Sequence, residues 1–343
     1  MFSAQTSQNA TQDMIDSKCD KRRKGVFGPA AGKQFVIFVD DVNMPQKEEY
    51  GAQPPIEILR QWFDNGGWYD RKALTFRKII DCIYVLACGP PGGGRNDITA
   101  RYVRHFNIIG YTAMQDESMQ LIFGSILSNF LNGSFENDLK PLSEPIVAST
   151  INVYNVILED LRPTPSKPHY TYNLRDLSKV FQGMLMMNSR KVSNLEDLAR
   201  MWVHETRRVF ADRLINQTDR SWFDGLLKEQ MDKNLEGMEW ETMVMGRPIM
   251  AVDFMIPGAE PKIYEEIKDL SQLQPTIEEY LGEYNADSKQ PMNLVMFMDA
   301  IGHVSRISRI IRQPRGNALL LGVGGSGRQS MSRMATYIAE YEL

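Results

Sequence analysis

An apolar run that ends in two carboxylates constrains the fold of this chain more than any other stretch. Residues 35–39 read Phe-Val-Ile-Phe-Val, and Asp40 and Asp41 follow them directly. A continuous run of β-branched and aromatic residues is typical of a strand buried on both faces of a parallel sheet. The two acids are then expected at the carboxyl end of the strand, where open α/β sheets bind their ligands.

A buried strand followed by two acids is also the acidic-strand signature of P-loop nucleotide hydrolases. In such sites one carboxylate holds Mg²⁺, directly or through water, and the next polarises the attacking water. The same pattern occurs at ordinary strand ends, where the acids have no catalytic role. The stretch therefore favours a nucleotide site, and other motifs are needed to decide.

Length and composition exclude several classes of protein. The chain has 343 residues, which is room for two or three ordinary domains, with 24% charged and 43% hydrophobic residues. A net charge of −4 favours neither nucleic acid nor an anionic membrane as a partner. We expect no membrane span, no signal peptide and no disulfide framework, since no apolar run is long enough and the three cysteines lack CxxC spacing.

The first third of the chain alternates strand and helix patterns. After the acids, Pro54 and Pro55 suit the first turn of a helix that Gly66 ends. Apolar strands are predicted over residues 79–88 and 106–110. Strands alternating with helices predict a parallel α/β sheet over residues 1–111.

Residues 112–235 show helical periodicity and almost no strand pattern. Helices are expected from Asp116, over about 145–160, after the candidate caps Asn173 and Asn194, and over 221–235. The inner face of the first of these helices is predicted to consist of Leu121, Ile122, Ser125, Ile126, Asn129 and Phe130. Residues 236–290, rich in Pro, Gly and acids, are interpreted as a connector.

A second motif lies near the end of the chain. A helix over residues 293–312 and a strand over 318–321 are predicted to precede a glycine-rich loop and a last helix. Strand, glycine-rich loop and helix are the context of a phosphate loop, whose backbone N–H groups wrap a phosphate. The candidate nucleotide-binding residues are Gly322, Val323, Gly324, Gly325, Ser326, Gly327, Arg328, Gln329 and Ser330.

The loop only partly meets the phosphate-loop consensus. Gly322 and Gly327 fit, but Arg328 stands where Lys belongs and is not its equivalent in a tight loop. Gln329 stands where the Mg²⁺-binding hydroxyl belongs, and Ser330 comes one place late. A glycine-rich turn without nucleotide is the alternative interpretation.

The order of the two motifs indicates two modules. Within one P-loop domain the phosphate loop precedes the acidic strand, whereas here the acids come first. The simplest explanation is two consecutive nucleotide modules. On this hypothesis the first lacks its phosphate loop and the second lacks its acids.

Six motifs together resemble those of dynein heavy chains, specifically the axonemal ones. They are the stretches that begin at Asp40 (DDVNMP), Tyr50 (YGAQ), Gly89 (GPPGGGR), Arg101 (RYVRH), Tyr172 (YNLRD) and Gly322 (GVGGSGRQS). The resemblance implies an α/β P-loop (AAA+) parallel sheet with a helical lid, followed by the start of a second AAA+ module. Residues 1–111 and 112–235 would be the sheet and lid of the third module of the motor ring, and residues 291–343 the start of the fourth.

The resemblance also suggests roles for the acids of the first module. Asp40 matches the Mg²⁺-associated acid. Asp41 occupies the position of the catalytic base, where most AAA+ proteins have Glu, and its reach is one methylene shorter. Gly89 lies where many relatives place a water-orienting Asn.

Three arginines match positions that sense nucleotide in the family. Arg101 and Arg104 match the arginine-finger region and would face the nucleotide of the second module. Arg175 matches the second sensor, directed at the nucleotide of the third. The alternatives are a basic surface helix for the first two, and an exposed first-turn arginine paired with Asp176 for the third.

The function that the resemblance implies is a microtubule motor driven by ATP hydrolysis, in which these modules are regulatory sites for ATP or ADP with Mg²⁺. The implied partners are other AAA+ modules of the same chain, microtubules, and intermediate and light chains, in the cytoplasm and cytoskeleton of the ciliary or flagellar axoneme. Rival interpretations are another AAA+ remodelling ATPase, such as a helicase or unfoldase, and an inactive scaffold segment of the ring.

Overall fold

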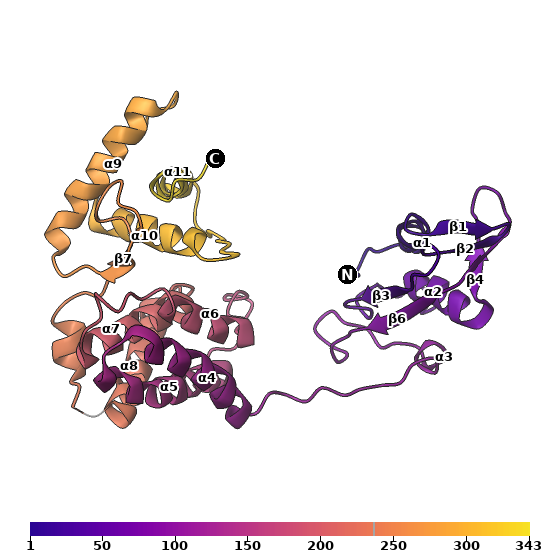
Figure 1. The fold of residues 1–343 in the computed structure, drawn as a ribbon, viewed down its shortest axis with the longest axis horizontal. Coiled ribbons are helices and arrows are strands. Elements are labelled where there is room, and N and C mark those ends of the chain that lie inside the picture. The colour runs from indigo at the N-terminus through magenta and orange to yellow at the C-terminus, as the bar shows by residue number, and fades with distance from the viewer. Residues whose placement is uncertain (236) are drawn as a thin grey trace. The chain divides into compact units, whose positions relative to one another are not determined.

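The computed structural model describes residues 1–235 and 237–343. The chain divides into two compact units, Met1–Thr112 and Ala113–Leu343 (Figure 1), called here the N-terminal and the C-terminal unit. The N-terminal unit has one hydrophobic core and the C-terminal unit has two, and each unit is described by itself.

The N-terminal unit combines two small sheets with helices. Its elements are α1 (Gln8–Asp16), β1 (Asp20–Arg23), β2 (Val26–Gly28), β3 (Phe35–Val39), α2 (Pro54–Asn65), β4 (Gly67–Tyr69), β5 (Phe76–Ile79), β6 (Cys82–Leu86) and α3 (Ala100–Val103). Strands β3 and β6 pair in parallel, from Phe35 opposite Cys82 to Val39 opposite Leu86. The other sheet has the order β1-β2-β5-β4, in which only β2 and β5 are parallel.

Helix α2 begins and ends where the sequence predicts. Pro54 and Pro55 occupy its first turn, and Gly66 ends it in the left-handed conformation with φ of 74°. Ile56 and Leu59 are fully buried and belong to the same core as Val39 of β3 and Tyr84 of β6.

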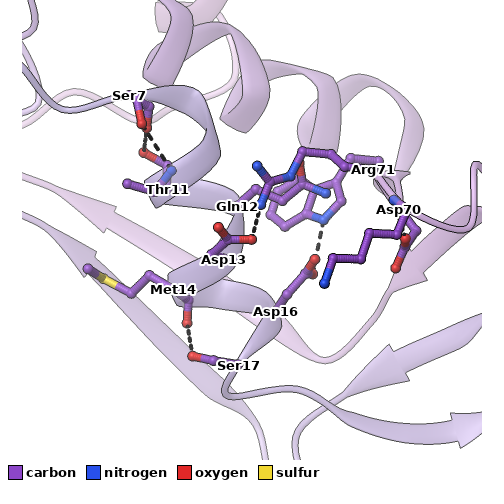
Figure 2. Close-up of polar contacts among 12 residues, drawn as sticks. Ser7, Thr11, Gln12, Asp13, Met14, Asp16, Ser17, Asp70 and Arg71 are labelled. Carbon is purple, nitrogen blue, oxygen red and sulfur yellow. Dashed lines mark hydrogen bonds and ion pairs between the residues drawn. The ribbon is translucent and has the colours of Figure 1, made fainter.

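Helix α1 makes polar contacts with the rest of the N-terminal unit (Figure 2). Ser7 caps it by accepting the N–H of Ala10 at 3.1 Å, and Gln12 donates to the carbonyl of Tyr69 at 2.9 Å. The indole N–H of the fully buried Trp68 donates to the Asp16 carboxylate at 3.1 Å. The bonds of Gln12 and Asp16 fix α1 to strand β4.

Three predictions for the N-terminal unit are wrong. The predicted strand over 79–88 is broken at Asp81, whose φ of 57° ends β5 and starts β6 in a different sheet. Residues 106–110 form no strand, because they pair with no neighbouring strand and are largely exposed. Strand β3 is buried on one face only, since Val36 and Phe38 are 66% and 59% exposed on the other.

The C-terminal unit is mostly helical. Its elements are α4 (Asp116–Ser134), η1 (Asn137–Leu142), α5 (Ser143–Asp160), α6 (Leu174–Met184), α7 (Leu195–Thr206), η2 (Arg207–Ala211), α8 (Gln217–Asn234), η3 (Glu241–Met245), β7 (Ala251–Val252), β8 (Glu265–Glu266), η4 (Leu270–Gln272), α9 (Leu273–Asp287), α10 (Met298–Arg312) and α11 (Arg328–Ile338). Residues 113–235, all described, contain helices and no strand, as the periodicity predicts. Helices α4 to α8 share one core, and α9 to α11 share a second.

The structure corrects the inner face of α4. Its buried residues are Met119, Phe123, Leu127 and Leu131. The predicted stripe is at the surface, with Leu121 72% exposed, except for Phe130, which is partly buried and packs against the core. The reason is the packing of α4 on α5 and α6, where the ring of Phe123 stacks on that of Phe181 with centroids 4.6 Å apart.

Other boundaries in the C-terminal unit also differ from the predictions. The connector over 236–290 contains the helix α9, whose Leu273 and Ile277 are fully buried against α10 and α11. Helix α10 begins at Met298, five positions after the predicted start. Residues 318–321 form no strand, because no other strand lies beside them to accept and donate hydrogen bonds.

Buried ion pairs join the two cores of this unit. The Arg200 guanidinium on α7 is 1% exposed and bonds Glu266 of β8, with Nε 3.0 Å from each carboxylate oxygen. Arg247 also donates to Glu266 Oε1, at 3.1 Å. A buried charge requires such a partner, so these contacts fix α7 against β8.

Candidate functional site

Asp40 and Asp41 lie together at the carboxyl end of β3. Both are half-buried, and Asp40 Oδ1 accepts the backbone N–H of Asp41 at 3.0 Å. The φ of Asp41 is 54°, a left-handed conformation that is uncommon outside glycine and turns the chain sharply away from the strand. The N–H of Val42 still bonds the carbonyl of Ala87, at 3.1 Å, so the turn remains attached to the segment that follows β6.

The glycine-rich stretch after β6 folds as a two-residue turn. Gly92 and Arg95 exchange backbone hydrogen bonds of 3.0 and 3.1 Å, and the two residues between them have φ of 58° and 89°. Positive φ at both central positions defines a type I′ turn, which glycine adopts without steric cost. The turn carries Arg95 to the acids, where its Nη2 lies 3.1 Å from Asp41 Oδ1.

Two asparagines connect this turn by hydrogen bonds to the loop that follows Asp41. The Asn43 side chain is 1% exposed and donates through Nδ2 to the carbonyl of Gly89 at 2.8 Å. Asn96 donates its backbone N–H to the Asn43 carbonyl at 2.9 Å and its side-chain Nδ2 to that of Pro45 at 2.8 Å. The acids and the glycine turn therefore form one rim at the end of the parallel strand pair.

Sequence reasoning missed Arg95 and Asn43 as site residues. Both stand within motifs that carry the family resemblance, so the motifs pointed at the right segments. The available signal was a single cation directly after a glycine turn, beside an acidic strand. Such a cation also occurs on ordinary surface loops, and only the folded turn shows which carboxylate it meets.

The acids do not by themselves form a metal cage. Over residues 1–235 and 237–343, no group of three or more His, Cys, Asp or Glu side chains could hold a metal ion. Mg²⁺ in nucleotide sites uses one or two carboxylates together with water and phosphate oxygens. Asp40 and Asp41 could supply these one or two carboxylates.

Arg101 and Arg104 lie on and directly after α3, and the structure does not bring them to the acids. Their side chains are 69% and 61% exposed, and they pair with Glu57 at 3.6 Å and Asp64 at 2.8 Å, both on α2. The hydrogen bond from Arg104 lowers the pKa of the Asp64 carboxyl. Both guanidinium groups are thus at the surface of the unit, where another module could reach them.

Arg175 is the second residue of α6 and is exposed. Asn173 and Asp176 form a capping box at the start of this helix. The Asp176 carboxylate is buried and pairs with Lys179 at 3.2 Å and Arg213 at 3.0 Å. The alternative that pairs Arg175 with Asp176 is therefore wrong, because other cations occupy this carboxylate.

Residues 322–330 form an exposed loop and the first turn of α11, in the C-terminal unit. Gly325 and Gly327 have φ of 78° and 75°, and the helix begins directly after them. The Arg328 guanidinium folds back over the loop, with Nη2 donating to the Val323 carbonyl at 3.2 Å. The N–H groups at the start of α11 are those that could bind a phosphate.

Family models match three separate stretches of the chain. Residues 1–114 match a P-loop containing dynein motor region, 123–220 the ATPase lid domain of dynein heavy chains, and 292–343 the P-loop containing dynein motor region D4. Fold and matches define parts of two P-loop motor modules with a helical lid between them.

Individual relatives agree with the family models. The chain is 53% identical to dynein axonemal heavy chain 1 of Mus musculus and 52% identical to that of Homo sapiens, over 99% of its length. It is 47% identical to dynein axonemal heavy chain 3 of Mus musculus, over 100% of its length. The chain belongs to the dynein heavy chain family, axonemal type. It spans only 8 to 9% of the length of these relatives.

Within the part of the chain that the structure describes, no helix combines the length and apolar character needed to span a membrane.

Proposed function

We propose that this segment supplies two regulatory nucleotide sites to the motor ring of an axonemal dynein heavy chain, which moves on microtubules by hydrolysing ATP. The observation that carries the proposal is the rim at the end of β3, where Asp40 and Asp41 meet the glycine turn through Arg95 at 3.1 Å. Dynein motor matches at residues 1–114 and 292–343 support two sites rather than one.

At the first site, Asp40 binds Mg²⁺ together with ATP or ADP, and Asp41 is the base that orients the attacking water. A half-buried carboxylate at a strand end suits both tasks. Arg175, at the exposed start of α6, senses the nucleotide bound there. Arg101 and Arg104 act on the nucleotide of the preceding module, and their exposure of 69% and 61% supports a role toward a neighbour.

At the second site, residues 322–330 bind the phosphates of ATP or ADP. The glycines allow backbone N–H groups to approach the phosphate, and α11 adds the positive end of its dipole. Arg328 supplies the cation in place of the usual lysine.

The proposed partners are the other AAA+ modules of the same heavy chain, microtubules through the whole motor, and dynein intermediate and light chains. The proposed location is the cytoskeleton of the ciliary or flagellar axoneme. The location is supported by the axonemal type of the relatives, and the partners by the membership of the chain in the dynein heavy chain family.

An inactive ring scaffold is the second candidate. One observation favours this candidate. Arg328 donates to the Val323 carbonyl at 3.2 Å, so the cation that a bound phosphate would need already has a partner in the loop.

The test uses the full-length heavy chain that contains this segment. Asp41→Asn should slow ATP turnover and microtubule gliding, and Arg328→Ala should weaken nucleotide binding at the second site. Asp13→Asn is the matched control, because Asp13 is an exposed acid of α1 outside the rim. Unchanged turnover, gliding and binding in both variants would favour the scaffold.

A further inference from the structure

The Asp41 carboxylate is engaged by a cation of its own unit. Arg95 Nη2 lies 3.1 Å from Asp41 Oδ1, and the two side chains are 40% and 28% exposed. A general base must come within hydrogen-bond reach of the water it activates. The Oδ1 atom that accepts from Arg95 is directed at the guanidinium, so the ion pair restrains how the carboxylate can turn toward a water.

The surroundings make room for this guanidinium. A Cβ placed on Gly89 would lie 3.1 Å from Arg95 Cζ and 3.1 Å from its Nε, closer than ordinary packing allows. A side chain at position 89 would require the Arg95 guanidinium to shift by a few tenths of an ångström. The absence of a side chain there lets the guanidinium lie against the backbone beside Asp41.

The backbone of the turn does not depend on the ion pair. The Gly92–Arg95 hydrogen bonds and the bonds of Asn43 to Gly89 and Asn96 to Pro45 hold it in place. The Arg95 side chain can therefore leave Asp41 by rotation about its own bonds, and it can be replaced without loss of the turn.

We propose that Arg95 is a positioning residue that restrains Asp41, so that the carboxylate acts as a base only in the fraction of time in which the guanidinium is displaced. This inference rests on the proposed role of Asp41 as the base. It adds a built-in brake on hydrolysis at the first site.

The test measures phosphate release by the full-length heavy chain. The rate lost in Asp41→Asn defines the share of release that depends on Asp41. Arg95→Gln should raise the Asp41-dependent rate of phosphate release about two- to fivefold. This factor corresponds to the free energy of a partly exposed ion pair. Arg95→Lys, which keeps the charge, should restore most of the restraint. Gly89→Ala should also raise the Asp41-dependent rate, because the alanine Cβ would lie 3.1 Å from Arg95 Cζ and the guanidinium must shift to admit it.

Two controls separate the brake from general damage. Arg22→Gln breaks an ion pair with Asp81 of the same 3.1 Å length in the same unit and should leave the rate unchanged. In the Asp41→Asn background, Arg95→Gln should have no effect, because the restrained base is gone.

The outcomes distinguish this inference from the proposed function. If Asp41→Asn does not reduce phosphate release, Asp41 is not a base, and its proposed role and the brake fail together. If Asp41→Asn reduces release but Arg95→Gln lowers it or leaves it unchanged, the brake alone is overturned. A loss of activity in Arg95→Gln would instead place Arg95 among the groups that assist the reaction.

Discussion

The Arg309 guanidinium of α10 forms a buried ion pair with the Glu205 carboxylate of α7 in the C-terminal unit. Nε lies 3.3 Å from Oε1, Nη2 bonds Oε2, and the Tyr264 hydroxyl donates to Oε1 at 2.7 Å. Glu205 is fully buried, and its partners are nearly so. Burial alone would lower the pKa of Arg309, but the charges and hydrogen bonds of Glu205 and Tyr264 together outweigh it and the pKa is raised.

This pair joins two regions that match different family models. Glu205 belongs to the stretch matched by the lid domain, and Arg309 to the stretch matched by the next motor region. Because both charges are out of water, neither is stable there without the other. We therefore expect the lid and α10 to move as one body.

Glu205→Gln should destabilise the C-terminal unit by about 3–5 kcal/mol, because it leaves the Arg309 charge buried without a counter-ion. Denaturant unfolding of the 343-residue chain measures the change. Asp13→Asn, which breaks an exposed pair with Arg71, should cost less than about 1 kcal/mol. Equal costs for the two variants would show that the buried pair is no stronger than a surface pair.

Gly183→Ala should also destabilise this unit. A Cβ at this position of α6 would lie 1.7 Å from Glu205 Oε2 and 2.7 Å from Arg309 Nη2. The ion pair must shift to admit it, at a cost of about 1–3 kcal/mol. Gly124→Ala is the matched control, since it is also in a helix but meets no atom within 4 Å. The control should be neutral or stabilise the unit by up to about 1 kcal/mol, because alanine favours helix. Thermal unfolding measures the stability of both variants. Destabilisation by Gly124→Ala as well would contradict the role given to the contact with Glu205.

His204 should make the C-terminal unit sensitive to mild acid. Its burial, with the charges of Arg208 and Arg309, holds its pKa well below the ordinary value. In the unfolded chain, His204 therefore binds a proton as the pH falls through about 6.5, whereas in the folded chain it stays neutral. The stability present above that pH is lost as the pH falls below it. The free energy of unfolding should fall by about 1.4 kcal/mol per pH unit below pH 6.5 from this group.

The pH prediction is checked by urea unfolding at several values between pH 5 and 7.5. His204→Gln should flatten the dependence, whereas His303→Gln, on the exposed side of α10, should leave most of it. A slope that survives His204→Gln would assign it to other groups.

Arg175→Ala should weaken the response of the first nucleotide site to ATP in the intact heavy chain. The residue is exposed, so its loss should cost little stability, within about 0.5 kcal/mol. Titration of ATP against the wild type and the variant measures the affinity. Lys179→Ala serves as the control for a cation on the same helix. Unchanged affinity in Arg175→Ala would make Arg175 a plain surface residue.

Local signals predicted the ends of helices well. Pro54 and Gly66 delimit α2, and Asn173 and Asn194 cap α6 and α7, because proline, glycine and asparagine act on backbone groups next to them. The inner face of α4 was not predictable in this way. Its sequence is apolar on nearly every side, so two helical stripes fit it equally, and packing on α5 decided between them.

The candidate site shows the same limit. Asp40 and Asp41 were predictable because a buried strand and its acids are contiguous in sequence. Arg95 was not, because it lies 54 positions from Asp41 and reaches it through a turn that depends on two glycines. The predicted strand over 318–321 failed for a related reason, since a strand exists only beside a neighbour that it can bond.

On the proposed function, the acids at the end of β3 and the loop at residues 322–330 serve different nucleotide sites. Hydrolysis requires a phosphate loop, an acidic strand and a neighbour's arginine around one nucleotide. Phosphate release by the purified 343-residue chain, followed over hours with ATP and Mg²⁺, tests this claim most directly. We expect no release above background, while calorimetry should detect weak binding of an ATP analogue that Arg328→Ala reduces. Phosphate release that Asp41→Asn abolishes would contradict it, because the chain would then hold a complete site of its own.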